Sequence, residues 1–444
     1  MKKVLFTILC SLPLLLCCGK DFLDEKREAN QVIPADLYDY QALLDNSTVM
    51  NKQAAFRLMT IGSDEYSYPQ GVWETLSPIS YYYLKNGYIW SDDVYEGKDV
   101  LDWNNAYQAI MYANLALDAK DPNSGGSGSE DWKNVRGQAL FHRSFAYYQL
   151  VQTFCRPYDP NTARSDRGIP LRLDYDVTSD PFYGSVEDIY NRIIADLTES
   201  VALLPVSQVT NYRPSKLSSY ALLARIFREM SRWDGALECA DRILSVKKDL
   251  LDYNKVNAAT TYPFDAMKKG MDNKEILFYC QSFGAPIMSK GEVNQIMLDS
   301  YEANDLRKTL YFKNGKRFYG SYAGSIFFNG LAVDEVFLIR AEAFLRKGQI
   351  SAAKSDLEFL LANRYKNGEF GALPTEREAL LDRVSKERIK ELFMRGTRWS
   401  DIRQQNLKDG SKIILTRQAG GREYTLLPDD PKWVWQWPDN EKNN

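Results

Sequence analysis

The sequence predicts a mainly α-helical protein, in which tetratricopeptide-like helix–turn–helix pairs form a scaffold and a loop-rich, irregular portion carries a few short strands. Three observations lead to this fold class. Several long segments repeat apolar residues every three or four positions, as one face of a helix does. Two segments share the small-residue spacing of a helix–turn–helix unit. Three other stretches are rich in Gly, Pro and aromatic residues and have no helical period.

The amino-terminal residues have the pattern of a bacterial lipoprotein signal peptide. A basic start precedes the apolar run Val4–Leu16, which is shorter than the ~20 residues that span a bilayer. Cys17 and Cys18 follow this run directly, where a lipoprotein signal peptidase cleaves. We predict that residues 1–17 are removed and that acyl chains on Cys18 anchor the protein without spanning the membrane. Acylation at Cys17 is less favoured, and the alternative is an ordinary secretory peptide with incidental cysteines.

Helical periodicity is clearest in three segments of the first half. Residues 102–120 carry one apolar face, and the Gly- and Ser-rich residues 121–129 end this segment. A second pattern covers residues 132–154, and a third covers residues 186–204, where Pro205 stops it. Each segment is therefore predicted to be a helix.

Two segments of the second half resemble each other. In the first, Ala224 is followed three residues later by a Phe and twelve residues later by Ala236. In the second, Ala341 is followed by a Phe at the same distance and then by Ala353. Small residues at this spacing allow two helices to pack closely around a turn, so both segments are predicted helix pairs.

Three stretches between the helices are expected to be long loops with a few short strands. They cover residues 62–97, 156–183 and 251–330. Long loops without regular structure are uncommon unless they are functional. The ligand site is therefore expected among them.

Composition argues against several classes of function. The net charge of −3 is spread along the chain without a basic block, which argues against nucleic acid as a partner. Cys155, Cys239 and Cys280 are isolated, so they predict neither disulfides nor a zinc site and are expected to be buried. His142, the one histidine, is expected to pack in the core. A single histidine argues against zinc hydrolases and His-dependent triads; no metal or cofactor is predicted.

Motifs along the whole chain match those of one known family. The most specific is Arg395-Gly396-Thr397-Arg398-Trp399-Ser400-Asp401, and the first is Cys18-Gly19-Lys20-Asp21-Phe22-Leu23-Asp24. The others follow in order: Ser63-Asp64-Glu65, Tyr88-Ile89-Trp90, Trp103-Asn104-Asn105-Ala106-Tyr107, residues 137–151, Gly168-Ile169-Pro170-Leu171, residues 338–343 and residues 387–392. By these motifs the chain resembles the SusD/RagB nutrient-binding outer-membrane lipoproteins of Bacteroidetes. Gly19 and Cys155 are modest departures from the family pattern.

The resemblance implies one SusD-like domain over residues 18–444, with an amino-terminal part to about residue 215 and a carboxyl-terminal part after it. It also implies a lipoprotein held in the outer membrane through acylated Cys18 and facing the cell exterior. Such a protein binds a nutrient glycan or oligosaccharide and passes it to a SusC-like TonB-dependent transporter. Enzymatic activity is not part of the family's role, so no catalytic residue is expected. The stretch of residues 20–25, which contains three acidic residues directly after the anchor, resembles a surface-export signal of the Bacteroides type, with a solvated tether as the alternative.

Sugar recognition without chemistry requires flat aromatic rings that stack on the sugar and polar side chains that bind its hydroxyl edge. The chain has 28 Tyr, 20 Phe and 9 Trp, and residues 66–90 are especially rich in them. The predicted ligand-binding residues are Tyr68, Trp73, Tyr81, Tyr82, Tyr83 and Asn86. The alternative is that most of these rings fill the core, and consecutive tyrosines cannot all face one way. Residues 282–291 are a weaker second candidate.

Two rival functions stay open at this point. A lipid-anchored glycoside hydrolase would need two carboxylates in a cleft, for which Asp92-Asp93 and Asp334-Glu335 are candidates. A tetratricopeptide scaffold for proteins or peptides would bind in a concave helical groove rather than at the loop aromatics. The charged element Arg395–Asp401 is interpreted as structural, because its arginines and acids can join helices.

Overall fold

The computed structural model describes residues 34, 36–77, 82–121, 128–176, 178–264, 273–282, 285–320, 322, 326–408 and 412–441. The predicted signal peptide, Cys18 and Tyr81 lie outside these residues. Among the residues that are described, no helix combines the length and the apolar character needed to cross a membrane.

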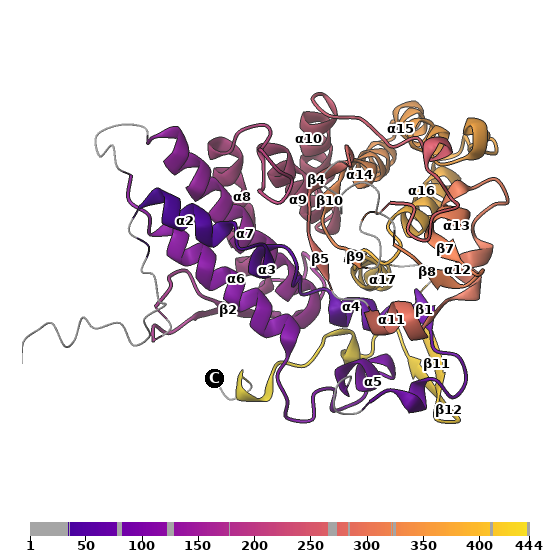
Figure 1. Ribbon diagram of the computed structural model, residues 1–444, viewed down its shortest axis with the longest axis horizontal. Coiled ribbons are helices and arrows are strands. Elements are labelled where there is room, and N and C mark those ends of the chain that lie inside the picture. Colours follow the sequence, from indigo (N-terminus) through magenta and orange to yellow (C-terminus); the bar gives the residue numbers. More distant parts are fainter. Residues whose placement is uncertain are drawn as a thin grey trace, which may run out of the picture.

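Long helices follow one another from one end of the molecule to the other (Figure 1). They are α6 (Leu101–Leu117), α7 (Glu130–Phe154), α8 (Val186–Leu203), α9 (Lys216–Glu229), α10 (Trp233–Leu244), α14 (Val333–Arg346), α15 (Ile350–Ala362) and α16 (Arg377–Glu391). The three helices predicted for the first half are confirmed as α6, α7 and α8. Serine side chains begin several of them: Ser129 accepts a hydrogen bond from the Trp132 backbone, and Ser185 and Ser215 each form a capping box.

The two predicted helix–turn–helix units are confirmed as the pairs α9–α10 and α14–α15. The alanines at the repeated positions are at most 1% exposed, so they allow the paired helices to approach closely. In the turns, Ser231 and Gly348 occupy the same place and both adopt a left-handed backbone, with φ of +56° and +77°. The units therefore repeat in geometry as well as in spacing, although only the second has the glycine that this conformation favours.

Short elements make up the irregular portion. Its helices are α2 (Leu37–Leu44), α3 (Ser47–Met50), α4 (Arg57–Gly62), α5 (Tyr82–Tyr88), α11 (Ala285–Lys290), α12 (Gln295–Asp299), α13 (Leu306–Tyr311) and α17 (Arg398–Leu407). Its strands are β1 (Tyr66–Ser67), β2 (Arg167–Leu171), β3 (Phe182–Ser185), β4 (Ile276–Phe278), β5 (Gln281–Ser282), β6 (Glu292–Val293), β7 (Phe312–Lys313), β8 (Arg317–Phe318), β9 (Phe327–Phe328), β10 (Leu331–Ala332), β11 (Leu415–Ala419) and β12 (Arg422–Leu426).

All of these strands pair in two-stranded antiparallel sheets: β1–β6, β2–β3, β4–β10, β5–β9, β7–β8 and β11–β12. The predicted loops thus contain the expected strands, and they also contain short helices that were not predicted. The side chain of Asn294 caps α12 and that of Asp305 caps α13. A local cap, rather than an apolar repeat, marks where each of these helices begins.

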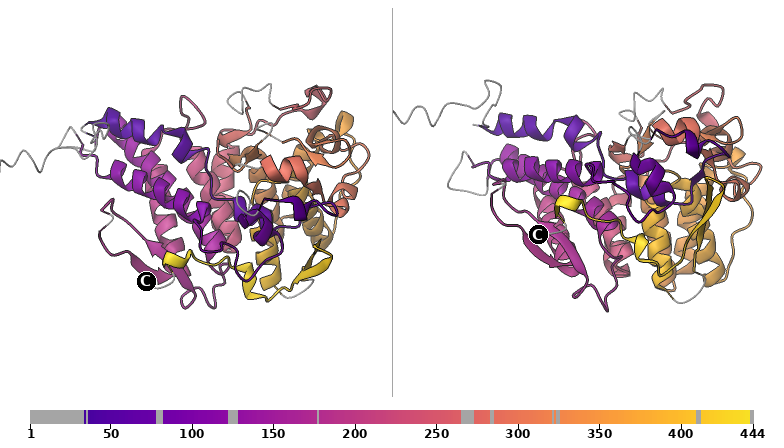
Figure 2. Two further views of the ribbon diagram at one scale, coloured as in Figure 1. Left: turned by 60° about the horizontal axis from the view of Figure 1, so that its bottom comes forward. Right: turned by 90° about the horizontal axis from the view of Figure 1, so that it is seen from below.

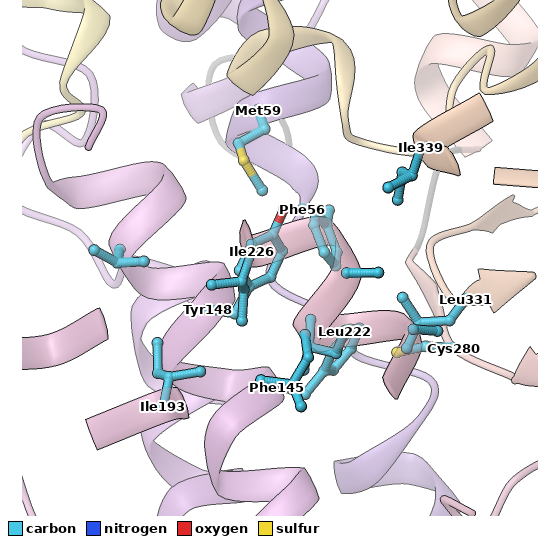
Figure 3. Close-up of a cluster of buried hydrophobic side chains, with 14 of the residues drawn as sticks. Phe56, Met59, Phe145, Tyr148, Ile193, Leu222, Ile226, Cys280, Leu331 and Ile339 are labelled. Atoms are coloured by element: carbon cyan, nitrogen blue, oxygen red, sulfur yellow. The ribbon is translucent and has the colours of Figure 1, made fainter. Parts of the chain in front are cut away.

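Two clusters of buried side chains form most of the core. The larger lies among the long helices, and Figure 3 shows part of it, with Phe145 of α7 beside Leu222 of α9. The smaller is largely aromatic and lies among the short elements, where it includes Tyr66, Tyr68 and Tyr88. The irregular portion therefore has a core of its own.

The carboxyl-terminal segment returns to the helices of the first half (Figure 2). The backbone of Trp435 donates a hydrogen bond of 3.1 Å to α7, and the ring of Trp437 lies 5.2 Å from that of Trp103 on α6. Trp433 and Trp435 also pack on Trp399 of α17, with ring centroids 4.5 and 5.4 Å apart. Trp433 and Trp435 are thus part of the larger core cluster, and Trp437 packs against it.

Buried ion pairs join elements of the second half. Arg307 of α13 is fully buried and contacts Asp305, Glu387 and Glu391 at 2.7, 2.6 and 2.9 Å. Arg364 also contacts Glu391, at 2.7 Å. These arginines hold α13 and the end of α15 against α16.

A group of three buried carboxylates lies beside these pairs. Oxygen atoms of Glu275, Asp334 and Glu391 are within 4.8 Å of one another. Arg364 contacts Glu275 at 2.9 Å, and Arg395 contacts Asp334 at 2.5 Å. The guanidinium groups thus supply positive charge that buried carboxylates require.

Candidate functional site

The aromatic segment, defined here as residues 64–97, lies on the irregular portion of the fold. Its first strand, β1, pairs with β6, which brings Tyr66 opposite Val293. The rings of Tyr66, Tyr68 and Tyr88 pack together, with centroids 4.8–5.8 Å apart. Tyr68 is 6% exposed, and its backbone donates a hydrogen bond of 3.1 Å to the Tyr88 hydroxyl. In this conformation Tyr68 is a core residue, and its ring offers no free face for a ligand.

Arg417 of β11 organises this tyrosine cluster from the far end of the sequence. Its guanidinium lies 4.1 Å from the ring centroid of Tyr88 and 4.6 Å from that of Trp90. It also donates hydrogen bonds to the backbone oxygens of Ser63 and Tyr88. A cation over aromatic faces in a desolvated site stabilises the packing. No motif in the sequence pointed to Arg417.

Trp73 lies at the surface of the same segment and is half-buried. Its Nε1 donates a hydrogen bond of 3.0 Å to the backbone oxygen of Lys85, whose Nζ lies 4.7 Å from the ring centroid. Glu74, the next residue, accepts a hydrogen bond of 2.9 Å from the backbone of Gly420 at the tip of the β11–β12 hairpin. Contacts from two elements therefore fix the orientation of the indole, while part of it stays accessible.

The other predicted binding residues belong to α5 or precede it. Tyr83 is half-buried and packs between the two core clusters. The Asn86 amide donates to the backbone oxygen of Val94 at 3.2 Å and to Glu96 at 3.0 Å, so it holds the following turn in place. Tyr81 and the side chain of Tyr82 lie outside the described part of the structure. The structure thus brings Trp73, Tyr83 and Asn86 to one short region and assigns Tyr68 to the core.

The two carboxylate pairs considered for a hydrolase have other partners. Asp334 contacts Arg395, and Glu335 contacts Arg225 at 2.5 Å. Although burial opposes ionisation, these arginines lower the pKa of both carboxyl groups, whereas the general acid of a glycosidase needs a raised pKa. Asp92 is exposed and contacts Lys432 at 2.8 Å. The pKa of Asp92 is lowered as well, chiefly by its hydrogen bond with Lys432, so none of these three carboxyl groups has the raised pKa of a glycosidase general acid.

The element Arg395–Asp401 has the structural role predicted from the sequence. Arg398 binds Asp64 through two hydrogen bonds of 2.7 Å, which attaches the aromatic segment to α17. Asp401 accepts hydrogen bonds from Arg388 and Arg228 at 2.9 and 2.8 Å. These contacts join α9, α16 and α17.

The histidine and the cysteines are core residues, as predicted. His142 is 3% exposed and packs against Phe278, and burial lowers its pKa to about 3. Cys155, Cys239 and Cys280 are free and buried, and burial raises the pKa of each thiol to about 12. These groups have neither the exposure nor the pKa of reactive side chains.

Comparisons with known proteins give a consistent result. A SusD-like family model, described as starch-binding and associating with the outer membrane, matches residues 21–227. The chain is 30% identical over 163 residues to SusD-like protein P2 of Formosa agariphila, a stretch that is 36% of this chain and 29% of that protein. The match thus spans less than a third of that relative.

Solved structures resemble the fold over nearly its whole length. A SusD superfamily protein from Bacteroides fragilis has a TM-score of 0.73 at 17% identity, covering 92% of this chain and 98% of that one. One from Bacteroides thetaiotaomicron has a TM-score of 0.69 at 18% identity, with coverage of 92% and 98%. A SusD-like carbohydrate binding protein from Bacteroides vulgatus has a TM-score of 0.68 at 18% identity, with coverage of 92% and 96%.

Proposed function

We propose that the chain is a member of the SusD family and acts as a cell-surface lipoprotein that binds a nutrient glycan and delivers it to a SusC-like TonB-dependent transporter without altering it chemically. The observation that carries this proposal is the match of the family described as starch-binding and outer-membrane-associated to residues 21–227. The likeness of the whole fold to SusD superfamily structures supports it. In this proposal residues 18–444 act as one domain.

The proposed attachment is through lipid on Cys18, after removal of residues 1–17. The basic start, the short apolar run and the cysteines behind it support this assignment. More than one acyl chain on a cysteine gives stable anchoring to a bilayer. Mass spectrometry of the amino-terminal peptide from membranes tests it, and an unacylated mature terminus would overturn it.

The proposed glycan site is the accessible surface around Trp73. Its indole is fixed by the bond to Lys85 and by the neighbouring hairpin contact, so little conformational entropy is lost when a sugar stacks on it. Tyr81, Tyr82, Tyr83 and Asn86 are proposed as its neighbours in binding. The role proposed for Tyr68 is indirect, as packing beneath this surface.

Affinity electrophoresis tests the glycan proposal. The soluble mature protein lacking Cys18 is run through gels that contain starch, xylan, mannan, β-glucan or a host glycan, with release of reducing ends assayed in parallel. We expect one polysaccharide to retard the protein without hydrolysis. Trp73→Ala is expected to weaken binding roughly three- to tenfold, the size of one aromatic contact.

Trp233→Ala is the matched control for this experiment. Trp233 of α10 is also half-buried with a cation near its ring, since Arg346 lies 5.4 Å from the ring centroid, but it belongs to the scaffold. This variant should bind like the wild type. Equal losses in both variants would refute the assignment of Trp73, and hydrolysis would refute the non-enzymatic role.

The transporter proposal has a separate test. The full chain is captured from detergent-solubilised outer membranes of its own cells, and co-purifying proteins are identified by mass spectrometry. Recovery of a TonB-dependent barrel in near-stoichiometric amount is expected. Recovery of the chain alone under conditions that preserve such complexes would overturn delivery to a transporter.

A further inference from the structure

A cavity of about 370 Å³ lies between α6 and the segment that connects β2 to β3. Its volume is in the range of about 300–1,000 Å³ that is typical of small-molecule sites. The carboxyl-terminal segment ends beside the same hairpin in both views of Figure 2, and Glu441 contributes to the lining. The cavity shares no lining residue with the aromatic segment.

One face of α6 forms the first wall. The cavity is lined by Asn104, Tyr107, Gln108 and Met111. Tyr107 and Gln108 each lie three or four residues from both Asn104 and Met111, so all four are on one side of the helix. Asn104 and Gln108 are exposed, and within the described residues their side-chain amides form no hydrogen bond. Two amide groups are therefore available to a ligand.

Hydrogen bonds fasten the opposite wall to the helices. The Tyr107 hydroxyl donates to the backbone oxygen of Pro170 at 2.8 Å. The Asn114 amide donates to the backbone oxygens of Arg172 and Asp174 at 2.9 and 2.8 Å, and Asn114 is 3% exposed. Because these hydrogen bonds hold the wall in place, the cavity is formed before any ligand arrives, which reduces the entropic cost of binding.

The lining combines aromatic rings with hydrogen-bonding groups. Trp103 and Tyr107 pack together with ring centroids 4.9 Å apart, and Tyr175 is 46% exposed, so its ring has an accessible face. The charged lining residues are three acids, Asp174, Asp176 and Glu441, and one base, Arg172. Arg172 already donates to the backbone oxygen of Ser179 at 3.0 Å. The local charge is therefore negative.

We propose that this cavity is a second saccharide site, separate from the surface around Trp73, and that it accepts a neutral sugar. The Tyr175 ring stacks on the face of the sugar, the amides of Asn104 and Gln108 bind hydroxyls at its edge, and the carboxylates accept hydrogen bonds from further hydroxyls. The excess of carboxylates repels uronates and sulfated sugars. The inference goes beyond the proposed function, since a glycan could bind at Trp73 without it.

Saturation-transfer NMR tests the second site, because it detects weak binding of small sugars. The probes are maltohexaose, cellohexaose, xylohexaose, mannohexaose and laminarihexaose, with hexagalacturonate as an anionic comparison. We expect the Trp73→Ala variant to retain a signal from a neutral hexasaccharide. Adding Tyr175→Ala or Gln108→Ala to that variant should weaken binding roughly three- to tenfold, and hexagalacturonate should give no signal that depends on these residues.

Phe182→Ala in the Trp73→Ala background is the matched control. Phe182 begins β3 of the same hairpin and is 57% exposed, but it does not line the cavity, so its removal should leave the signal unchanged. Loss of all binding with Trp73→Ala alone would overturn the second site and leave the proposed function intact. A signal that survives Tyr175→Ala and Gln108→Ala, or no signal from any neutral sugar with the wild type, would also overturn it.

Discussion

Replacing Arg307 by Met tests whether the buried ion pairs hold the second half together. The substitution keeps an unbranched, apolar side chain but removes a guanidinium that contacts three buried carboxylates. Breaking a buried pair by removing one partner costs about 3–5 kcal/mol. Lys390 stays 2.7 Å from Glu387, and Arg364 stays 2.7 Å from Glu391. Lys390 also lies 3.5 Å from Asp305, so all three carboxylates keep a cation and we expect a loss of stability near the lower end, about 3 kcal/mol.

The loss of stability in Arg307→Met should depend on pH in a defined direction. Burial raises the pKa of Glu391, while Arg364 and Arg307 oppose that rise, so the pKa should be higher still in the variant. A carboxyl group whose pKa is higher in the folded protein than in the unfolded chain takes up protons on folding. Ionisation of such a group lowers the stability most at pH values above its pKa in the folded protein. This effect becomes smaller as the pH drops toward its pKa in the unfolded chain. The difference between variant and wild type should therefore shrink from pH 8 to about pH 5.5.

Urea unfolding followed by circular dichroism measures this difference at both pH values. Arg377→Met is the matched control, because Arg377 begins α16 but is half exposed and pairs with the exposed Glu378. Exposed pairs contribute about 0–1 kcal/mol. A loss in Arg307→Met no larger than in this control, or a loss that does not change with pH, would refute the reasoning.

Two further changes have predicted effects on stability. Ser231→Gly should stabilise the protein by up to about 1 kcal/mol, because relief of the strain in the left-handed backbone at this position exceeds the extra entropy of the unfolded chain. Urea unfolding measures this change, and an unchanged or lower urea midpoint would contradict the prediction. Burial raises the pKa of Glu65 to about 7, so its ionisation opposes folding increasingly as the pH rises from 5 toward 8. Glu65→Gln should therefore gain on the order of 2 kcal/mol relative to the wild type over that interval, and parallel stability curves would exclude this role for the carboxylate.

The scaffold was predictable because its signals are local. An apolar repeat marks α6, α7 and α8, and the alanine spacing marks both helix pairs, since each depends only on neighbours along one helix. The family resemblance was also predictable, because its motifs are contiguous. Burial of individual rings in the irregular portion was not predictable in the same way.

Tyr68 and Trp73 illustrate that limit. Both lie in one Tyr- and Trp-rich stretch, yet Tyr68 is buried against Tyr88, over which Arg417 lies, and Trp73 stays at the surface. The difference depends on β11, which follows them by more than three hundred residues in the sequence. The cavity beside α6 was not predicted from the sequence for a similar reason. Its walls come from α6, the β2–β3 connection and the carboxyl-terminal segment, which are far apart in the sequence.

The return of the carboxyl-terminal tryptophans to the first helices has a consequence for how the chain acquires its structure. Trp435 and Trp437 follow α6 and α7 by more than two hundred residues in the sequence, so the apolar surface of these helices stays uncovered until that distant segment packs on it. Contacts between such distant residues also slow folding. A fragment that ends before residue 431 should therefore aggregate or be degraded, although it would contain every long helix of the scaffold.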